Sequence, residues 1–161
     1  MASHEELEYG QLKRCSLFGG VTEQAFEFIR PHIRLMHFET GERIVTEGEV
    51  NDRIYFIESG AVEILKQSCC NGEGTERQLF VMYPGDTFGE MELIDIQPCA
   101  ASVRALEPTA TLSLSNRDLY KVSKSDMKTY ALLVMNLARE ISRRLRRADE
   151  MLVGMDSETP V

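Results

Sequence analysis

The residues with the clearest capacity for chemistry lie in the segment PGDTFGEMEL, at positions 84–93. Gly89 can allow a ligand to come close to the backbone, and amide groups exposed at the start of a helix donate to anions. The carboxylate of Glu90 is unsuited to holding phosphate, but it can accept a hydrogen bond from a sugar hydroxyl. Anion-binding amides beside one hydroxyl-accepting carboxylate therefore point to a ribose phosphate as the ligand.

Short strands are the elements that must position this segment. Between positions 33 and 115, runs rich in Ile, Val, Phe, Tyr and Leu alternate with turns that carry glycine. About eight short strands at this spacing predict an all-β sandwich or jelly roll. The expected strands lie near 33–38, 43–46, 54–58, 61–66, 78–83, 87–88, 101–106 and 110–115.

Helices are expected on both sides of the strands. Residues 21–32 read as a short helix with Thr22 as its N-cap. Another short helix should run through Val122, capped by Ser115 or Asn116. The predicted fold is therefore mainly β with flanking helices: an eight-stranded β-roll or jelly roll with an N-terminal helix and a long C-terminal helix.

The long C-terminal helix is expected from position 126 to about 153, and it carries an apolar seam. The seam residues are spaced four and three apart, as in a two-stranded coiled coil, for fewer than three heptads. This spacing predicts a homodimer, and the alternative is that the seam packs against the domain's own β-roll. The seam consists of Val134, Ala138, Ile141, Leu145, Ala148 and Leu152.

Length and composition limit the class of protein. A chain of 161 residues with 43% hydrophobic and 27% charged residues fits one soluble globular domain. We expect one domain over 1–161, with the β-roll at about 33–115, a helical segment at about 116–153 and a polar tail at 154–161. The acidic N-terminus is unlike a signal peptide, the longest apolar run is too short to span a bilayer, and the four cysteines show no secretory pattern, so we expect a cytoplasmic protein without a membrane partner.

Charge is unevenly distributed along the chain. The formal net charge is −8, which argues against general affinity for nucleic acid because phosphate contacts depend on lysine and arginine. Five arginines and one glutamate nevertheless lie between positions 139 and 147. These arginines fall mostly off the apolar seam, so a solvated helix face is the expected explanation for them.

Several sequence blocks resemble the cyclic-nucleotide-binding domain family, the sensory half of bacterial catabolite activator proteins and of cAMP-dependent kinase regulatory subunits. The blocks occur in the family's order between about positions 17 and 147, with glycines at turn positions. They read LFGGV, ETGERIVTEGE, DRIYFIESGAVEI, YPGDTFGEMELI, ASVRALEPT and AREISRRLRR. The resemblance implies a phosphate-binding cassette that runs from the FGE motif, through a short helix, to an arginine-containing strand start.

By this resemblance, Gly89 and Met91 would offer backbone contacts, and Glu90 would accept a hydrogen bond from the ribose 2′-hydroxyl. Residues after the proline would clamp the cyclic phosphate. The implied ligand-binding residues are Phe88, Gly89, Glu90, Met91, Cys99, Ala100 and Ala101. The candidate base-facing residues on the C-terminal helix are Arg144, Arg147 and Ala148.

The chain departs from the family pattern in the phosphate clamp. The family reads P-R-A-A-T-V or P-R-S-A-x-V, whereas positions 98–103 read PCAASV, so Cys99 stands in the arginine position. A charge-assisted hydrogen bond to phosphate is worth roughly 1.5–3 kcal/mol, and its loss should weaken binding by about one to two orders of magnitude. Arg104 lies too far along the strand to replace it, and Ser102 could donate one neutral hydrogen bond. A reactive thiol at Cys99 is one hypothesis, and a small residue filling space is the simpler interpretation.

Three interpretations of function stay open. A cyclic nucleotide (cAMP, cGMP or a cyclic dinucleotide) binds weakly or in another pose; the pocket is remade for another ligand; or the domain is a degenerate, ligand-free dimerisation and docking scaffold. We expect the first: a stand-alone regulatory sensor module that signals through its C-terminal helix to a protein partner.

Other functions are expected to be absent. His4, His32 and His37 lack metal-ligand spacing, and no catalytic motif occurs, so we expect no enzyme activity, no metal and no required cofactor. The sequence ends shortly after the long helix, so we also expect no DNA-binding domain and no nucleic-acid partner.

Overall fold

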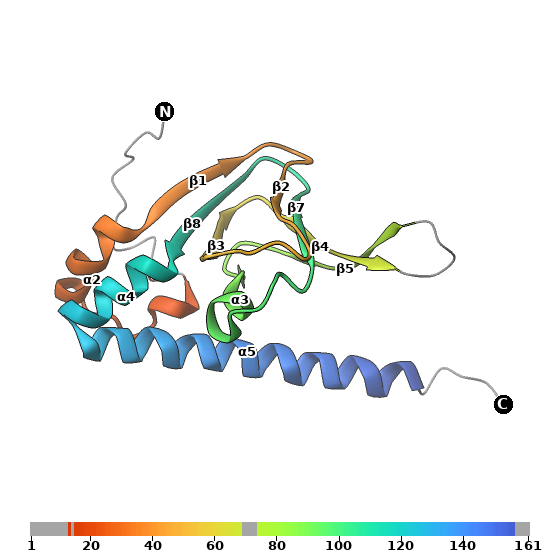
Figure 1. Ribbon diagram of the computed structural model, residues 1–161. Helices are drawn as coiled ribbons and strands as arrows, with labels where there is room; N and C mark the ends of the chain where they lie inside the picture. Colours follow the sequence, from red (N-terminus) through yellow and green to blue (C-terminus); the bar gives the residue numbers. More distant parts are fainter. Residues whose placement is uncertain (1–12, 14, 69–73, 157–161) are drawn as a thin grey trace.

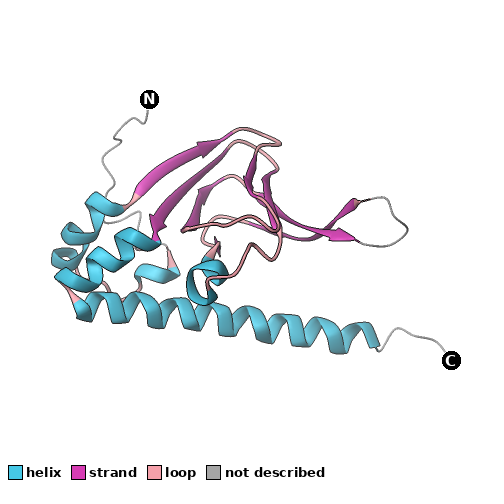
Figure 2. Cartoon of the chain, in the orientation of Figure 1, coloured by secondary structure: helices cyan, strands magenta, loops and turns pink. Residues whose placement is uncertain are grey.

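The computed structural model describes residues 13, 15–68 and 74–156, and it confirms the predicted β-roll with flanking helices (Figures 1 and 2). The strands form two four-stranded sheets in which all neighbours pair antiparallel. The first sheet has the order β1 (Arg34–Phe38), β8 (Thr109–Ser115), β3 (Arg53–Ser59) and β6 (Thr87–Phe88). The second has the order β2 (Arg43–Val45), β7 (Ser102–Ala105), β4 (Val62–Ser68) and β5 (Thr75–Met82). The N-terminal segment and most of the expected polar tail lie outside the described residues.

Two apolar cores hold the fold together, and β3 separates them. Successive side chains of a strand point to opposite faces. Ile54 and Phe56 therefore join the core between the first sheet and the helices, whereas Tyr55 and Ile57 join the core between the two sheets. This double burial explains why β3 reads as a continuous apolar run rather than an alternating one.

The helical caps form where the sequence predicts them. Thr22 accepts a hydrogen bond from the amide of Ala25 at 3.2 Å and caps α2 (Glu23–Ile29), which continues into a 3₁₀ turn, η2 (Arg30–His32). Ser115 caps α4 (Asn116–Ser125), which is one turn longer than expected. Two further short elements are η1 (Ser16–Phe18) and α3 (Glu90–Asp95).

Helix α5 (Met127–Asp156) runs past the other helices and past α3, and it continues beyond the body of the domain (Figure 1). Leu133 and Leu137 bury one face of α5 in the core beneath the first sheet. The predicted seam lies on another face and is mostly exposed: Leu145, for example, is 61% exposed. The alternative in which the seam packs on the domain's own β-roll is therefore wrong. No helix among the described residues is long and apolar enough to cross a membrane.

Candidate functional site

The FGE motif forms a tight passage from strand to helix. Phe88, in β6, pairs with Tyr55 of β3, and their rings stack at 4.9 Å between centroids. Gly89 follows with φ of +81°, and a Cβ atom there would lie 2.4 Å from the carbonyl oxygen of Arg53 and 2.8 Å from Nδ2 of Asn51. Only glycine fits this combination of conformation and close approach. The turn therefore fixes where α3, and with it Glu90, begins.

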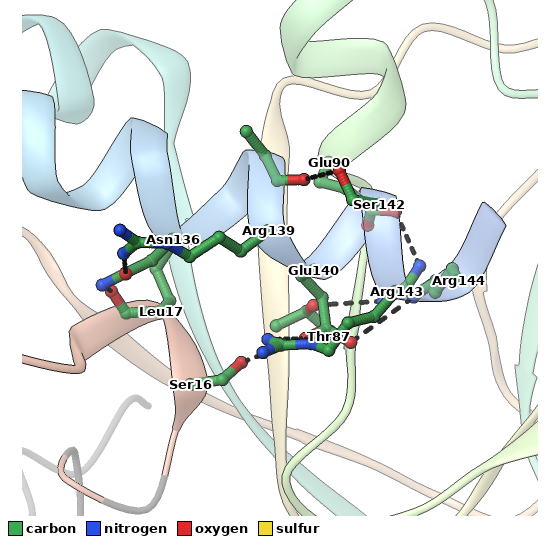
Figure 3. A network of polar contacts seen from close by, with 11 residues as sticks. Ser16, Leu17, Thr87, Glu90, Asn136, Arg139, Glu140, Ser142, Arg143 and Arg144 are labelled. Atoms are coloured by element: carbon green, nitrogen blue, oxygen red, sulfur yellow. Dashed lines mark hydrogen bonds and ion pairs between the residues drawn. The ribbon is translucent and has the colours of Figure 1, made fainter. Parts of the chain in front are cut away.

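Glu90 is buried, and a residue of α5 neutralises it. Glu90 is only 2% exposed. Its Oε1 accepts a hydrogen bond from Nη1 of Arg144 at 2.6 Å. The other terminal nitrogen of Arg144 donates to Oγ1 of Thr87 at 3.1 Å (Figure 3). A buried carboxylate needs such a partner because an uncompensated buried charge is costly. The carboxylate expected to bind a ligand thus forms an ion pair with the long C-terminal helix.

Cys99 faces the interior of the roll. It is 3% exposed and belongs to the apolar core between the sheets, together with Val103 and, at its edge, Ala101. Its backbone is held by the β2–β3 turn: the Cys99 amide donates to the Glu49 carbonyl at 2.8 Å, and the Gly48 amide donates to the Cys99 carbonyl at 2.9 Å. This burial among apolar side chains favours a space-filling role for the thiol.

Ala100 and Ser102 alternate along the chain with the inward-facing residues, and they take part in a separate network of hydrogen bonds. Oγ of Ser102 accepts hydrogen bonds from Nη1 of Arg43 at 2.8 Å and from the amide of Glu47 at 2.9 Å. The Lys66 ammonium donates to the carbonyl of Ala100. Ser102 accepts both of these hydrogen bonds, so they leave the donation from its own O–H to a ligand as a prediction.

Arg104 has a structural role. Its Nε donates to Oε1 of Glu63 at 2.7 Å, and Glu63 is buried on the neighbouring strand β4. The pair joins β7 to β4 and keeps the Arg104 guanidinium away from the cassette.

A cavity of about 360 Å³ borders Cys99 at the end of the roll. This volume is within the range of small-molecule sites. Its wall is polar and mixed in charge, because Arg43 and Arg53 face it together with Glu49 and Asp52. Of the predicted ligand-binding residues, Cys99 lines this cavity.

The remaining predicted residues are scattered around the cassette. Phe88 is buried and Ala101 half-buried, whereas Met91 and Ala100 are exposed. The structure does not test whether these residues bind a ligand, so their roles stay predictions. On α5, Arg147 and Ala148 are exposed further along the helix than Arg144.

Arg144 is a candidate base-facing residue, and its contact with Glu90 is the feature that sequence reasoning missed. A solvated helix face was expected for the arginines, and this is wrong for Arg144, which is held by Glu90 and Thr87. A weak signal exists in the sequence: Glu140 lies one helical turn before Arg144, on the same side of α5. Glu140 is itself buried, and its Oε1 lies 3.9 Å from Nε of Arg144.

Comparisons with known proteins agree with this architecture. The family model described as "Cyclic nucleotide-binding domain" matches residues 35–126. The chain is 30% identical over 144 residues, 89% of its length, to a CRP-like cAMP-activated global transcriptional regulator of Mycobacterium tuberculosis. It is 33% identical over 123 residues, 74% of its length, to a cAMP-dependent protein kinase regulatory subunit of Yarrowia lipolytica.

Solved structures show the same fold. The catabolite activator protein of Thermus thermophilus superposes with a TM-score of 0.72 at 29% identity, covering 88% of this chain and 63% of that one. A cyclic nucleotide-binding domain from Methylobacillus flagellatus superposes with a TM-score of 0.79 at 22% identity, covering 91% of this chain and 80% of that one.

The chain spans only part of its relatives: 61% of the mycobacterial regulator and 30% of the kinase regulatory subunit. The matched part contains the two sheets and the FGE turn in which Gly89 and Glu90 lie. The chain belongs to the cyclic nucleotide-binding domain family.

Proposed function

We propose that this domain is a regulatory module that binds a cyclic nucleotide in its cassette and transmits the occupancy of the cassette to helix α5. The observation that carries the proposal is the 2.6 Å contact between Glu90 and Arg144. Glu90 stands where a ribose hydroxyl would be accepted, and Arg144 belongs to the helix that would respond. A ligand that alters this contact acts directly on α5.

The ligand class follows from the chemistry of the cassette. A carboxylate held at the start of α3 can accept from a vicinal sugar hydroxyl, and the family relatives include regulators named for cAMP. Cys99 adds no positive charge to the phosphate clamp. We therefore expect cAMP or cGMP to bind about 10 to 100 times more weakly than in a cassette with arginine at this position.

A second candidate function is a ligand-free scaffold. Two observations favour it: Cys99 is packed into the apolar core, and Glu90 already has an internal counter-ion. A cassette arranged in this way is stable without a ligand, so the domain could serve in dimerisation and docking alone.

The output surface proposed for either function is the exposed seam of α5. The seam residues from Val134 to Leu152 are apolar or small, and most of them are exposed. A second copy of the chain is the proposed occupant, because heptad-spaced apolar residues pair with an identical seam.

The proposed further output is a protein partner. The expected exclusion of nucleic acid is not supported, since one relative is a transcriptional regulator.

Isothermal titration calorimetry with cAMP, cGMP and cyclic dinucleotides tests the proposal, performed on the natural chain and on Cys99→Arg. Micromolar binding by the natural chain, abolished by Glu90→Ala, supports the regulatory module. Binding by Cys99→Arg alone supports the scaffold, with a family pocket inactivated at one residue. No binding by either protein contradicts a nucleotide-binding role.

A further inference from the structure

We propose that Arg144 supplies from α5 the positive charge that the cassette lacks at position 99, so that the ligand's phosphate is held by the signalling helix itself. This inference rests on the proposed function, because it concerns the same ligand in the same site. It assigns Arg144 to the phosphate, whereas the sequence suggested only that it could face the base.

The guanidinium lies beside the carboxylate that would accept the ribose hydroxyl. It donates hydrogen bonds to two residues of the cassette, Glu90 at 2.6 Å and Thr87 at 3.1 Å. Its side chain is 24% exposed. In a 3′,5′-cyclic nucleotide, the 2′-hydroxyl and the cyclic phosphate are attached to adjacent ribose carbons. A ligand whose 2′-hydroxyl reaches Glu90 therefore places its phosphate close to Arg144.

The guanidinium also has donors to spare. Arginine carries five N–H groups in a fixed fork, and the contacts with Glu90 and Thr87 use one from each terminal nitrogen. The others can bind phosphate while the contact with Glu90 persists, and a planar fork suits phosphate geometry. Arg144 can thus bridge the carboxylate and the anion.

Charge balance favours the same assignment. Without Arg144, the buried carboxylate of Glu90 would repel an incoming phosphate. With Arg144, the carboxylate is already neutralised before the ligand arrives, and the phosphate meets the remaining N–H donors of the guanidinium. Glu140, 3.9 Å from Nε of Arg144, keeps the side chain directed along this side of α5.

Three other cations lie near the cassette and fit the role less well. Arg53, which lines the cavity beside Cys99, lies 3.7 Å from a carboxylate oxygen of Asp52 and donates to Oγ of Ser113 at 3.4 Å. Lys66 and Arg43 contact Ala100 and Ser102, which alternate with the inward-facing residues of the clamp. Lys66 lies 2.6 Å from a carboxylate oxygen of Glu47.

Arg43 is more firmly engaged, because its two terminal nitrogens bind the two carboxylate oxygens of Glu76 at 2.7 and 2.9 Å. Both Lys66 and Arg43 are therefore already engaged in ion pairs, although Arg43 also borders the cavity beside Cys99. Arg144 instead contacts the FGE motif.

The experiment compares cAMP with adenosine, which has the same base and 2′-hydroxyl but no phosphate. Dissociation constants are measured for the natural chain and for Arg144→Gln. We expect Arg144→Gln to weaken cAMP binding by at least about tenfold and adenosine binding by less than about threefold. Arg143→Gln, which alters a neighbouring arginine paired with Glu140, and Lys66→Gln are the matched controls and should keep the preference for cAMP.

Restoring the charge elsewhere should rescue the loss. Cys99→Arg in the Arg144→Gln background should return cAMP binding toward its original strength. If Arg144→Gln unfolds, Arg144→Lys serves in its place, because it keeps the charge but loses the fork, and it should retain part of the preference for cAMP.

Three results would overturn the inference while leaving a nucleotide-binding function intact. The first is an equal loss of cAMP and adenosine binding in Arg144→Gln, which would mean that Arg144 only positions Glu90. The second is a loss caused by Lys66→Gln and not by Arg144→Gln. The third is a natural chain that binds adenosine as well as it binds cAMP. Absence of binding to both compounds by the natural chain would overturn the proposed function and this inference together.

Discussion

Asn136 of α5 donates hydrogen bonds from its side-chain amide to the carbonyls of Leu17 and Gly19, each at 2.8 Å. This contact holds the N-terminal half of α5 against η1. Both partners are neutral, and they lie outside the proposed ligand site. Further along the helix, Arg144 makes the charged contact with Glu90. These two polar contacts of α5 differ in character, and the one made by Arg144 lies at the cassette (Figure 3).

The first contact should matter for stability rather than for ligand binding. Asn136→Ala removes both hydrogen bonds, together with the one that Oδ1 of Asn136 accepts from Nη1 of Arg139 at 2.8 Å, and leaves two backbone carbonyls to find other donors. We expect the free energy of unfolding to fall by about 2–3 kcal/mol, which corresponds to a decrease in Tm of roughly 5–10 °C. Thermal denaturation measures this, and calorimetry should show an unchanged dissociation constant for cAMP in the folded variant. A change in affinity without a change in Tm would contradict the assignment.

The turn at Gly89 should be intolerant of any side chain. In Gly89→Ala, the new Cβ would lie 2.4 Å from the carbonyl oxygen of Arg53, at a φ of +81°. We expect a loss of more than about 3 kcal/mol, from steric overlap and backbone strain together. Gly41→Ala is the matched control, because Gly41 has a similar φ of +83° but open space around it. It should cost only about 1 kcal/mol. Chemical denaturation compares the two, and equal losses would show that the close approach is unimportant.

Much of the fold could be predicted because local patterns determine it. The strands follow from apolar runs between turns, and the caps at Thr22 and Ser115 follow from residue type and position. Strand β5 begins earlier than expected, at Thr75 rather than position 78. Its first residues are exposed on both faces, so they show no period-two pattern. The start of a strand cannot be predicted from apolar alternation where all of its side chains are exposed.

The contact between Glu90 and Arg144 could not be predicted in this way. The two residues are 54 positions apart, and their meeting depends on how α5 is rotated and shifted relative to the roll. That placement is set by Leu133 and Leu137, which pack in the core with η1 and α2. Periodicity identified the exposed seam of α5, but not which of the polar residues beside it would reach the cassette.

The seam should produce a dimer that a single charge disrupts. Leu145 is 61% exposed in the single chain, so Leu145→Glu should leave the fold of the domain intact while placing two carboxylates against each other in a paired seam. We expect the natural chain to sediment as a dimer and Leu145→Glu to sediment as a monomer at the same concentration. Tyr120→Glu, on an exposed residue of α4, introduces the same charge away from the seam and should remain dimeric. A natural chain that is monomeric at high concentration would contradict a homodimer.

Asp118 should make stability depend on pH in the acid range. Burial alone would raise its pKa, but hydrogen bonds from Lys121 and Ser115, together with the nearby charges of Lys121 and His32, outweigh burial and lower the pKa from 3.8 to about 2. A carboxyl group whose pKa is lowered by folding stabilises the folded state above its unfolded pKa, and this contribution is lost as pH falls through the folded value. The contribution should therefore be complete above about pH 5, mostly lost by about pH 2 and gone near pH 1.

The variant Asp118→Asn tests this, because it keeps the shape of the side chain and removes its charge. At pH 6 we expect the variant to be less stable than the natural chain by about 1 kcal/mol, a value reduced by solvent screening. Urea denaturation at a series of pH values should show the difference shrinking between pH 4 and pH 2. Asp149→Asn, at an exposed residue of α5, provides the control and should not show this dependence. A difference that stays constant down to pH 2 would mean that Asp118 stabilises the cap through its shape and not through its charge.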